Sequence, residues 1–488
     1  TSVAVIGFWQ TGAIPRAQQL NGLTWDIVGP SILEIVRSHA VALVLCLLLL
    51  GAAALLLRSL LRRASGSLIR PLHLVVAGFT LLAAGLGAAY QDTSQGTAFI
   101  ATQLFHSDLD VKQALSERSL QIEDYFFKAY YRDLAETEGP ARHPEILSQL
   151  RGSNIIWVVL ESVRAKDLPL YGGTADMPHF MQAREHMLLL DHLYVQDPRS
   201  TKAYTQMDMG RFSLLSWDTY SNNIPQMLPQ DGLAAHLGKL GYATAALVNG
   251  DAHYDNNQLF QKLHGYQHTL YRQEINPGSP SADDLKLLEQ AKDMVGKLHT
   301  PFYMMLWPIQ THHPYGRKYW SHEWNADQTA KQNLDPTDHA RYLKALQEAD
   351  DWFGRLLEML KAQGLNENTT IVVTGDHGQA FREHEPGNGF HGTGVYEESV
   401  HVPGLIYHPK INGPHRDDRN LRLLDMPATV LEIAASKEHV FNDGRSLFRN
   451  YKQDMPIFLF NSWVGAIGII QDGHKLWRRT KSPQDIFF

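Results

Sequence analysis

Residues 371–378 read "IVVTGDHG", an apolar run that ends in a carboxylate and an imidazole. The run predicts a buried strand, and Asp376 and His377 follow it side by side. Carboxylate oxygen and imidazole nitrogen are usual protein ligands for Zn²⁺, Mn²⁺ and similar ions. Neighbouring strand residues point to opposite faces, so both side chains reach one ion only where the strand breaks into a loop. Because Gly375 and Gly378 flank the pair and allow that turn, we interpret the stretch as half of a metal site.

The sequence around this stretch alternates strands and helices from residue 154 onward. Several of the strands are continuous apolar runs, as expected when helices cover both faces of a sheet. We therefore predict an α/β fold, a mostly parallel sheet flanked by helices, with its chemistry at the carboxyl ends of the strands. The expected strands are 154–160, 187–195, 242–249, 302–308, 369–375 and 403–409, and the expected helices include 282–297 and 336–363.

Two more of the expected strands end in groups that could share the site. The stretch "NIIWVVLES" (154–162) ends at Glu161, and the strand at 302–308 runs into "IQTHHPY", which contains His312 and His313. Taken singly, Glu161 could cap the following helix and His312 could be an ordinary loop residue. Three such groups at strand ends favour one joint site.

A fourth segment, "DPRSTKAYTQMDMG" (197–210), places two hydroxyls before an expected helix. Ser200 or Thr201 could simply be the helix N-cap, the commonest role for these residue types there. Alternatively, one of them is a nucleophile activated by a metal, with the helix dipole favouring an anionic substrate. Lys202 and Arg199 could help to bind such an anion, or could be solvated surface charges.

Composition excludes some classes of protein. The chain has 488 residues, enough for more than one domain, and its net charge of −7 argues against a general nucleic-acid binder. Cys46 is the one cysteine, so neither an intrachain disulfide nor a thiolate zinc cluster can form. The chain begins with Thr1 rather than Met, and we expect it to be part of a longer protein.

Two apolar stretches predict a membrane region over residues 1–103. Residues 40–57 and 72–90 each approach the roughly 20 residues that cross a bilayer. Buried core helices are the alternative, but both runs are apolar all round rather than along one stripe. The loop between them carries four arginines and no acid, which the positive-inside rule places in the cytoplasm. Residues 151–488 would then form an extracytoplasmic catalytic domain.

Residues 104–150 are expected to be a helical linker. Their apolar residues recur at helical spacing and include the aromatic cluster "YFFKAYY" (125–131). The helix could lie in the membrane interface or pack against the catalytic domain, and the sequence favours neither.

Taken together, the motifs resemble the sulfatase / alkaline-phosphatase superfamily. The resemblance covers roughly residues 154–488 and keeps the motif order. Because predicted membrane helices precede this region, the architecture of the chain is similar to that of lipoteichoic acid synthases and lipid A phosphoethanolamine transferases. The motifs that carry it are "NIIWVVLES", "RSTKAYTQMDMG", "THHPY", "VVTGDHG" and "FHGTGVYEESVHVP".

The resemblance implies roles for individual residues. Glu161, Asp376 and His377 stand at positions of metal ligands, and the nucleophilic oxygen of Ser200 would complete the set. His312 matches a histidine that contacts substrate, with His313 as the neighbouring alternative. His391 matches a second histidine position that contacts the phosphate or a second metal.

The resemblance also bears on the nucleophile. Formylglycine sulfatases use Cys-x-Pro-Ser-Arg, whereas the sequence from Ser200 to Tyr204 lacks that pattern. The transferases have a threonine followed two or three residues later by a small residue. Ser200 with Ala203 fits the spacing, while Thr201 keeps the residue type but places Tyr204 where a small residue is expected. We favour Ser200, because a shift of one residue would turn the hydroxyl away from the metal.

The expected function is a membrane-anchored transferase. It would move phosphoglycerol or phosphoethanolamine from a phospholipid donor to a cell-envelope glycan or glycolipid through a covalent phospho-enzyme, using one divalent metal, Mn or Zn, with Mg as a further option. The expected location is the bacterial inner (plasma) membrane, multi-pass, with no nucleic-acid partner. The alternatives are a hydrolase on the same fold, a phosphodiesterase or sulfatase, and a catalytically inactive structural or glycan-binding protein.

Overall fold

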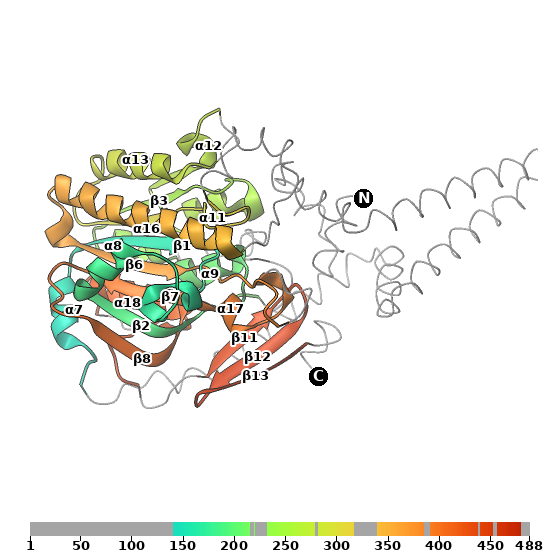
Figure 1. Cartoon of the computed structure of the whole chain (residues 1–488). Coiled ribbons are helices and arrows are strands. Elements are labelled where there is room, and N and C mark those ends of the chain that lie inside the picture. Colours follow the sequence, from blue (N-terminus) through green and yellow to red (C-terminus); the bar gives the residue numbers. More distant parts are fainter. Residues whose placement is uncertain are drawn as a thin grey trace, which may run out of the picture. The chain divides into compact units, whose positions relative to one another are not determined.

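The structure, a computed structural model, describes residues 140–214, 219, 232–278, 282–316, 339–384, 391–437, 440–451 and 456–479 (Figure 1). The predicted membrane region 1–103 and the linker up to residue 139 lie outside these residues. Among the helices that the structure does describe, none combines the length and the apolar character that crossing a bilayer requires.

An eight-stranded sheet forms the centre of the described region (Figure 1). Its order is β4-β3-β5-β1-β6-β7-β2-β8. Every neighbouring pair is parallel except the two that involve β7, which runs antiparallel to β6 and to β2. The predicted α/β fold with a mostly parallel sheet is confirmed. The strands are β1 Asn154–Leu160, β2 Met187–Tyr194, β3 Ala243–Val248, β4 His268–Tyr271, β5 Phe302–Trp307, β6 Thr369–Gly375, β7 His401–Tyr407 and β8 His415–Arg422.

Helices cover both faces of the sheet, which explains the continuous apolar strands. Alternate residues of β1 enter two different hydrophobic cores: Trp157 joins one, and its neighbour Val158 joins the other. The first core includes residues of α9, α10 and α18, and the second includes residues of α8, α13 and α16. The helices are α7 Pro144–Leu150, α8 Pro178–Ala183, α9 Ser200–Met209, α10 Leu233–Lys239, α11 Asn257–Leu263, α12 Arg272–Ile275, α13 Asp284–Val295, α16 His339–Ala362, α17 Glu397–Val400 and α18 Met426–Ile433.

Strand register brings the predicted ligands to one edge of the sheet. β1 pairs with β6 along its whole length, so that Leu160 lies opposite Gly375. Glu161 and Asp376, the next residue in each strand, therefore leave the sheet side by side. β5 pairs in parallel on the other side of β1, and its carboxyl end reaches the same edge.

A second, antiparallel sheet follows near the end of the described chain, and it was not predicted from the sequence. It consists of β11 Ile457–Asn461, β12 Ala466–Gln471 and β13 His474–Arg479. A short ladder pairs β9 Val440–Phe441 with β10 Gly444–Arg445. Asn461 donates to the backbone carbonyls of His391 (3.3 Å) and Gly394 (2.9 Å), so the β11–β12 turn holds a loop that the sequence analysis placed at the site.

Candidate active site at the carboxyl ends of the central strands

Glu161, Asp376 and His377 form a compact buried trio. Each offers one ligand atom, and these atoms lie within 4.8 Å of one another. His377 Nε2 lies 3.6 Å from Glu161 Oε1 and 3.3 Å from Asp376 Oδ2. The structure thus brings together the three side chains that the sequence analysis proposed as metal ligands.

The trio is oriented by hydrogen bonds from its surroundings. Asp376 Oδ1 accepts from the backbone N–H groups of Ser162 and His377, both at 2.8 Å. Ser162 is buried and has a φ of 58°, a left-handed conformation that points its N–H at this carboxylate. His377 Nδ1 lies 2.9 Å from the carbonyl of Gly378. Because a carbonyl only accepts, Nδ1 carries the hydrogen and Nε2 presents its lone pair to the trio.

Glu161 is anchored on two sides. Its Oε2 accepts from Trp307 Nε1 at 2.9 Å, and its backbone carbonyl accepts from the Thr311 hydroxyl at 2.6 Å. Oε1 therefore turns toward Ser200 and His377. Trp307 was missed at the sequence level, since an aromatic residue at the end of an apolar strand reads as core.

The electrostatics of the trio favour a bound cation. Burial, together with the carboxylate of Asp376, raises the pKa of Glu161, and burial raises the pKa of Asp376 to about 6. Burial lowers the pKa of His377, which favours the neutral imidazole that binds metals. Within the described part of the chain, no lysine or arginine forms an ion pair with either carboxylate.

The trio fits a divalent metal. Asp376 Oδ2 is buried and accepts no hydrogen bond from any described residue, a costly arrangement unless a cation is coordinated there. Together with the lone pair of His377 Nε2 and with Glu161 Oε1, which accepts from the hydroxyls of Ser162 and Ser200, it gives the oxygen and nitrogen donors that Zn²⁺ and Mn²⁺ accept.

Ser200 lies beside the trio at the first residue of α9. Its Oγ is 3.3 Å from Glu161 Oε1 and 3.2 Å from His377 Nε2. Thr201 is buried, and its Oγ1 makes no hydrogen bond within the described residues. The geometry therefore favours Ser200 over Thr201 as the hydroxyl that faces the ligands. The amino end of α9 adds a partial positive charge there.

The two cations near Ser200 are buried rather than solvated. Lys202 is fully buried, and its Nζ donates to the carbonyl of Leu214 at 2.5 Å. Arg199, also buried, donates to Ser462 Oγ at 3.1 Å and lies over the ring of Trp463 at 5.7 Å. Lys202 thus helps to hold the chain after α9, and its predicted contact with substrate stays a prediction.

The neighbouring histidines His312 and His313 differ in their surroundings. The charge of His312 lowers the pKa of Glu161, so this ring lies near the trio, and its Nδ1 donates to the carbonyl of His313 at 2.7 Å. The ring of His313 instead packs edge-on against Tyr315, at 5.6 Å between centroids. Of the two alternatives, the structure brings His312 toward the candidate site.

His391 also belongs to this cluster. Its ring centroid lies 3.9 Å from that of His377, and its Nδ1 lies 3.2 Å from Gln379 Oε1. Burial lowers the pKa of His391 well below its usual value, and the charges of His377 and His312 lower it further. His391 is therefore neutral at physiological pH and is placed to accept or relay a hydrogen bond.

Asp197 is a second residue that the sequence analysis overlooked. It is fully buried, its Oδ2 accepts from the N–H of Ser462 at 3.3 Å, and its charge acts on His377. Burial raises the pKa of Asp197 itself. Its position three residues before Ser200, in "DPRS", was visible in the sequence, but nothing local separates it from a turn aspartate.

The two glycines beside Asp376 and His377 are needed for space, which differs from our expectation. Neither has a positive φ, so the turn requires no conformation special to glycine. A Cβ on Gly378 would lie 2.1 Å from the carbonyl oxygen of Glu398, and one on Gly375 would lie 2.7 Å from that of Val163. Backbone from other segments packs directly against both positions.

The sulfatase family profile matches residues 153–436, more than half of the chain, and this span includes every residue of the candidate site. The chain belongs to the sulfatase family. Arylsulfatase K of Xenopus laevis is 32% identical to this sulfatase-family chain over 127 residues. The aligned residues are 26% of this chain and 23% of the relative. The match thus spans about a quarter of the curated relative's length.

Solved structures share the fold of this sulfatase-family chain at low identity. A protein of the alkaline phosphatase superfamily from Vibrio parahaemolyticus has a TM-score of 0.53 at 18% identity, covering 72% of this chain and 87% of that one. The lipoteichoic acid synthase LtaP of Listeria monocytogenes has a TM-score of 0.51 at 15% identity, covering 70% and 90%. At these identities the likeness concerns the fold alone.

Proposed function

We propose that this sulfatase-family enzyme is a metal-dependent transferase, which moves a phospho-head group through a covalent intermediate on Ser200. The observation that carries the proposal is the position of Ser200 Oγ, 3.2 Å from His377 Nε2 and 3.3 Å from Glu161 Oε1. A hydroxyl held against metal-ligand atoms at the start of a helix suits nucleophilic attack on an anionic ester.

Glu161, Asp376 and His377 would hold one divalent ion. When bound, such an ion supplies a lowered hydroxyl pKa and polarisation of the phosphoryl oxygen. The ligand types do not choose between manganese, zinc and magnesium.

The side chains of the site account for both halves of a transfer reaction. Ser200 Oγ attacks phosphorus, its proton passing to Glu161 Oε1, and the bond to the donor alcohol breaks. His312 protonates the departing alkoxide. In the second half, His312 removes the proton of an acceptor hydroxyl, whose oxygen displaces Ser200 from phosphorus. Glu161 returns the proton to the departing Ser200 Oγ, which restores the free serine.

The proposed donor is a phospholipid carrying phosphoglycerol or phosphoethanolamine, and the proposed acceptor is a cell-envelope glycan or glycolipid. The support comes from the apolar stretches 40–57 and 72–90, which predict a bilayer anchor, and from the arginines between them, which favour an extracytoplasmic catalytic domain. We propose the bacterial plasma membrane as the location. An anchor would raise the local concentration of a lipid donor. The fold neighbour LtaP is a lipoteichoic acid synthase, which agrees with this class of reaction.

Hydrolysis of a phosphodiester or sulfate ester is the second candidate. The name of arylsulfatase K favours it. Against a formylglycine mechanism stands the stretch after Ser200, which reads Thr201, Lys202 and Ala203 and lacks the modification pattern. Water in place of an acceptor hydroxyl would convert the same site from transfer to hydrolysis.

Product analysis separates the two candidates. The full chain is incubated with phosphatidylglycerol or phosphatidylethanolamine labelled in the head group, with and without a glycolipid acceptor. We expect the label in an acceptor adduct with wild-type protein and with Thr201→Val, and not with Ser200→Ala. If all released label is free glycerol phosphate or phosphoethanolamine, the transferase proposal fails and the hydrolase stands. If the protein cleaves sulfate esters and no phosphodiester, both the phospho-transferase and the phosphodiesterase proposals fail.

A further inference from the structure

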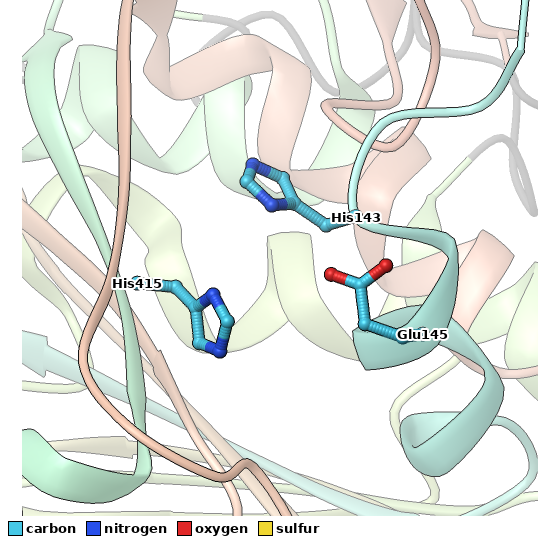
Figure 2. A group of neighbouring side chains, drawn as sticks. All are labelled: His143, Glu145 and His415. Atoms are coloured by element: carbon cyan, nitrogen blue, oxygen red, sulfur yellow. The ribbon is translucent and has the colours of Figure 1, made fainter.

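A second group of metal-binding side chains lies apart from the candidate active site. His143, Glu145 and His415 each offer one ligand atom, and these atoms lie within 4.8 Å of one another. Figure 2 shows the two imidazole rings and the carboxylate turned toward a shared space. Neither the resemblance to sulfatases nor the proposed reaction uses these residues.

The cluster lies at the opposite end of the sheet from the candidate active site. β8 runs parallel to β2, which has the same direction as β6 because both are antiparallel to β7. His415 is the first residue of β8, at the amino ends of these strands. Glu161 and Asp376 follow the carboxyl ends of β1 and β6, so the two clusters are separate sites.

The three residues join two distant parts of the chain. His143 is the N-cap of α7 and Glu145 lies in the first turn of that helix. β8 is one of the two edge strands of the central sheet. The cluster thus sits where the chain enters the described domain and meets the last strand of the sheet. His143 has a φ of 45° and a ψ of 47°, a left-handed conformation that is uncommon for a residue with a side chain.

An outer hydrogen bond orients the ring of His415 as metal-bound histidines are oriented. His415 Nε2 lies 3.1 Å from the carbonyl of Asn412, so Nε2 carries the hydrogen and Nδ1 is left with a lone pair. His143 Nε2 lies 3.6 Å from Oδ2 of Asp417, a fully buried carboxylate, and makes no hydrogen bond to any described residue. A small shift of the ring would bring it into hydrogen-bond range of that carboxylate. A carbonyl or carboxylate behind the second ring nitrogen is the usual outer partner of a metal-bound histidine.

The local charge tolerates a cation. Asp417 pairs with Arg419 (2.5 Å) and more distantly with Arg142 (3.7 Å), so those arginines are compensated by a carboxylate. Glu145 is exposed, and its carboxylate can move toward an ion without disturbing the core. Ligand atoms around a tetrahedral zinc lie about 3.4 Å apart, so a small contraction of the cluster completes the geometry.

We propose that His143, Glu145 and His415 form a zinc site that fastens the start of α7 to the edge strand β8. Two imidazole nitrogens and one carboxylate oxygen are a donor set that zinc uses, whereas magnesium and calcium prefer all-oxygen sites. With three protein ligands, the fourth position of the zinc would be open to solvent on the side of the exposed Glu145. The ion fixes the point at which the predicted membrane linker joins the catalytic domain.

Zinc binding by the full chain tests the proposal, with Asp376→Asn as background to remove the strand-end site. We measure zinc stoichiometry and affinity by equilibrium dialysis against Zn²⁺ alone. The background protein should bind one zinc per chain. Adding His415→Asn should weaken zinc binding by more than about 100-fold. Loss of an outer hydrogen-bond partner costs roughly 10- to 100-fold, and His415 is proposed as a direct ligand. His268→Asn, at an exposed histidine of β4, serves as the matched control and should leave it unchanged.

Two further readouts keep the test decisive. In otherwise wild-type protein, Glu145→Gln should leave turnover within about two-fold and reduce the zinc-induced rise in Tm. Because Glu145 is exposed, this variant replaces His415→Asn if the latter does not fold. The proposal would be overturned if Asp376→Asn protein bound zinc with the same stoichiometry and affinity after His415→Asn was added to it. The same outcome with Glu145→Gln in place of His415→Asn would also overturn it. Failure of the transferase proposal would leave this zinc measurement unaffected.

Discussion

Ser200 Oγ lies 3.2 Å from Nε2 of His377, although 177 residues separate them in the chain. The contact exists because β6 delivers His377 at its carboxyl end and α9 begins at that same edge of the sheet. Since Nδ1 of His377 donates to the Gly378 carbonyl, the nitrogen facing Ser200 has a lone pair. The hydroxyl and a metal-ligand atom thus share one space.

Replacing Ser200 by alanine should abolish the covalent intermediate. We expect turnover to fall by at least about 10³-fold, as for removal of other enzymatic nucleophiles. Intact-protein mass after incubation with donor lipid checks this: wild type and Thr201→Val should gain the phospho-head group, and Ser200→Ala should not. An adduct that maps to Thr201, or that persists in Ser200→Ala, would contradict the assignment.

Removing the metal or a ligand should stop the reaction. Chelation by EDTA should abolish turnover, and Mn²⁺ or Zn²⁺ should restore it. Asp376→Asn keeps the size of the side chain but removes a negative charge and a donor oxygen, so metal affinity should fall by more than about 100-fold. Dialysis against a metal-buffered series measures that affinity, with His415→Asn in both proteins so that the second proposed zinc site does not contribute. Unchanged affinity in Asp376→Asn would show that the ion binds elsewhere.

Trp307→Phe tests the orientation of Glu161. The substitution removes the N–H that donates to Glu161 Oε2 at 2.9 Å but keeps an aromatic ring in the core. We expect roughly 10- to 100-fold weaker metal binding, with the fold retained in far-UV circular dichroism. Trp352→Phe is the matched control, because that buried indole donates to the carbonyl of Asp284 instead. Equal metal affinities in the two variants would argue against an orienting role for Trp307.

Gly378→Ala should disrupt the loop that carries the ligands. A Cβ there would lie 2.1 Å from the carbonyl oxygen of Glu398, so backbone must shift, at a cost of about 1–3 kcal/mol in the free energy of unfolding. Gly238→Ala in α10 meets no atom within 4 Å and should be neutral or stabilising by up to about 1 kcal/mol. Urea unfolding of both variants makes the comparison. Equal midpoints would mean that the close approach at Gly378 is not limiting.

Asp208 should make stability depend on pH. It is buried in α9, and its Oδ1 accepts from the Tyr266 hydroxyl at 2.7 Å. Burial raises its pKa to about 7, from 3.8 for a free carboxyl. The folded state therefore holds a proton that the unfolded state loses, and this contribution to stability falls as pH rises from about 4 to 7.

Asp208→Asn checks this directly by denaturant unfolding at pH 5 and pH 8. The variant should lose less stability than wild type over that interval, by roughly 2–3 kcal/mol, because the titration between pH 5 and about 7 falls inside it. The exposed Asp418 gives a control in Asp418→Asn, which should follow wild type. Parallel pH profiles for wild type and Asp208→Asn would refute a buried, protonated carboxyl.

The sequence by itself determined six of the eight strands of the central sheet and the residues at the ends of those that carry the site, whereas the two edge strands, β4 and β8, were not predicted. β1 and β6 have the predicted limits, 154–160 and 369–375, because short runs of β-branched and apolar residues bounded by turn residues predict buried strands. β7 begins two residues earlier than predicted, at His401. Since parallel strands share an edge for their carboxyl ends, Glu161, Asp376 and His377 could be grouped before any coordinates existed.

Tertiary structure alone decided which neighbour faces the site. Ser200 and Thr201 share a residue class, but successive helix residues point about 100° apart, and the packing of α9 turns Ser200 toward Glu161 and Thr201 into the core. Tertiary structure also decided that His312 rather than His313 lies toward the site and that Trp307 donates to Glu161. It likewise decided that backbone from distant segments packs against Gly375 and Gly378. The His143, Glu145 and His415 cluster likewise depends on an edge strand that the sequence did not predict. Local sequence encodes propensity and periodicity, whereas contacts between distant segments exist only once the chain has packed.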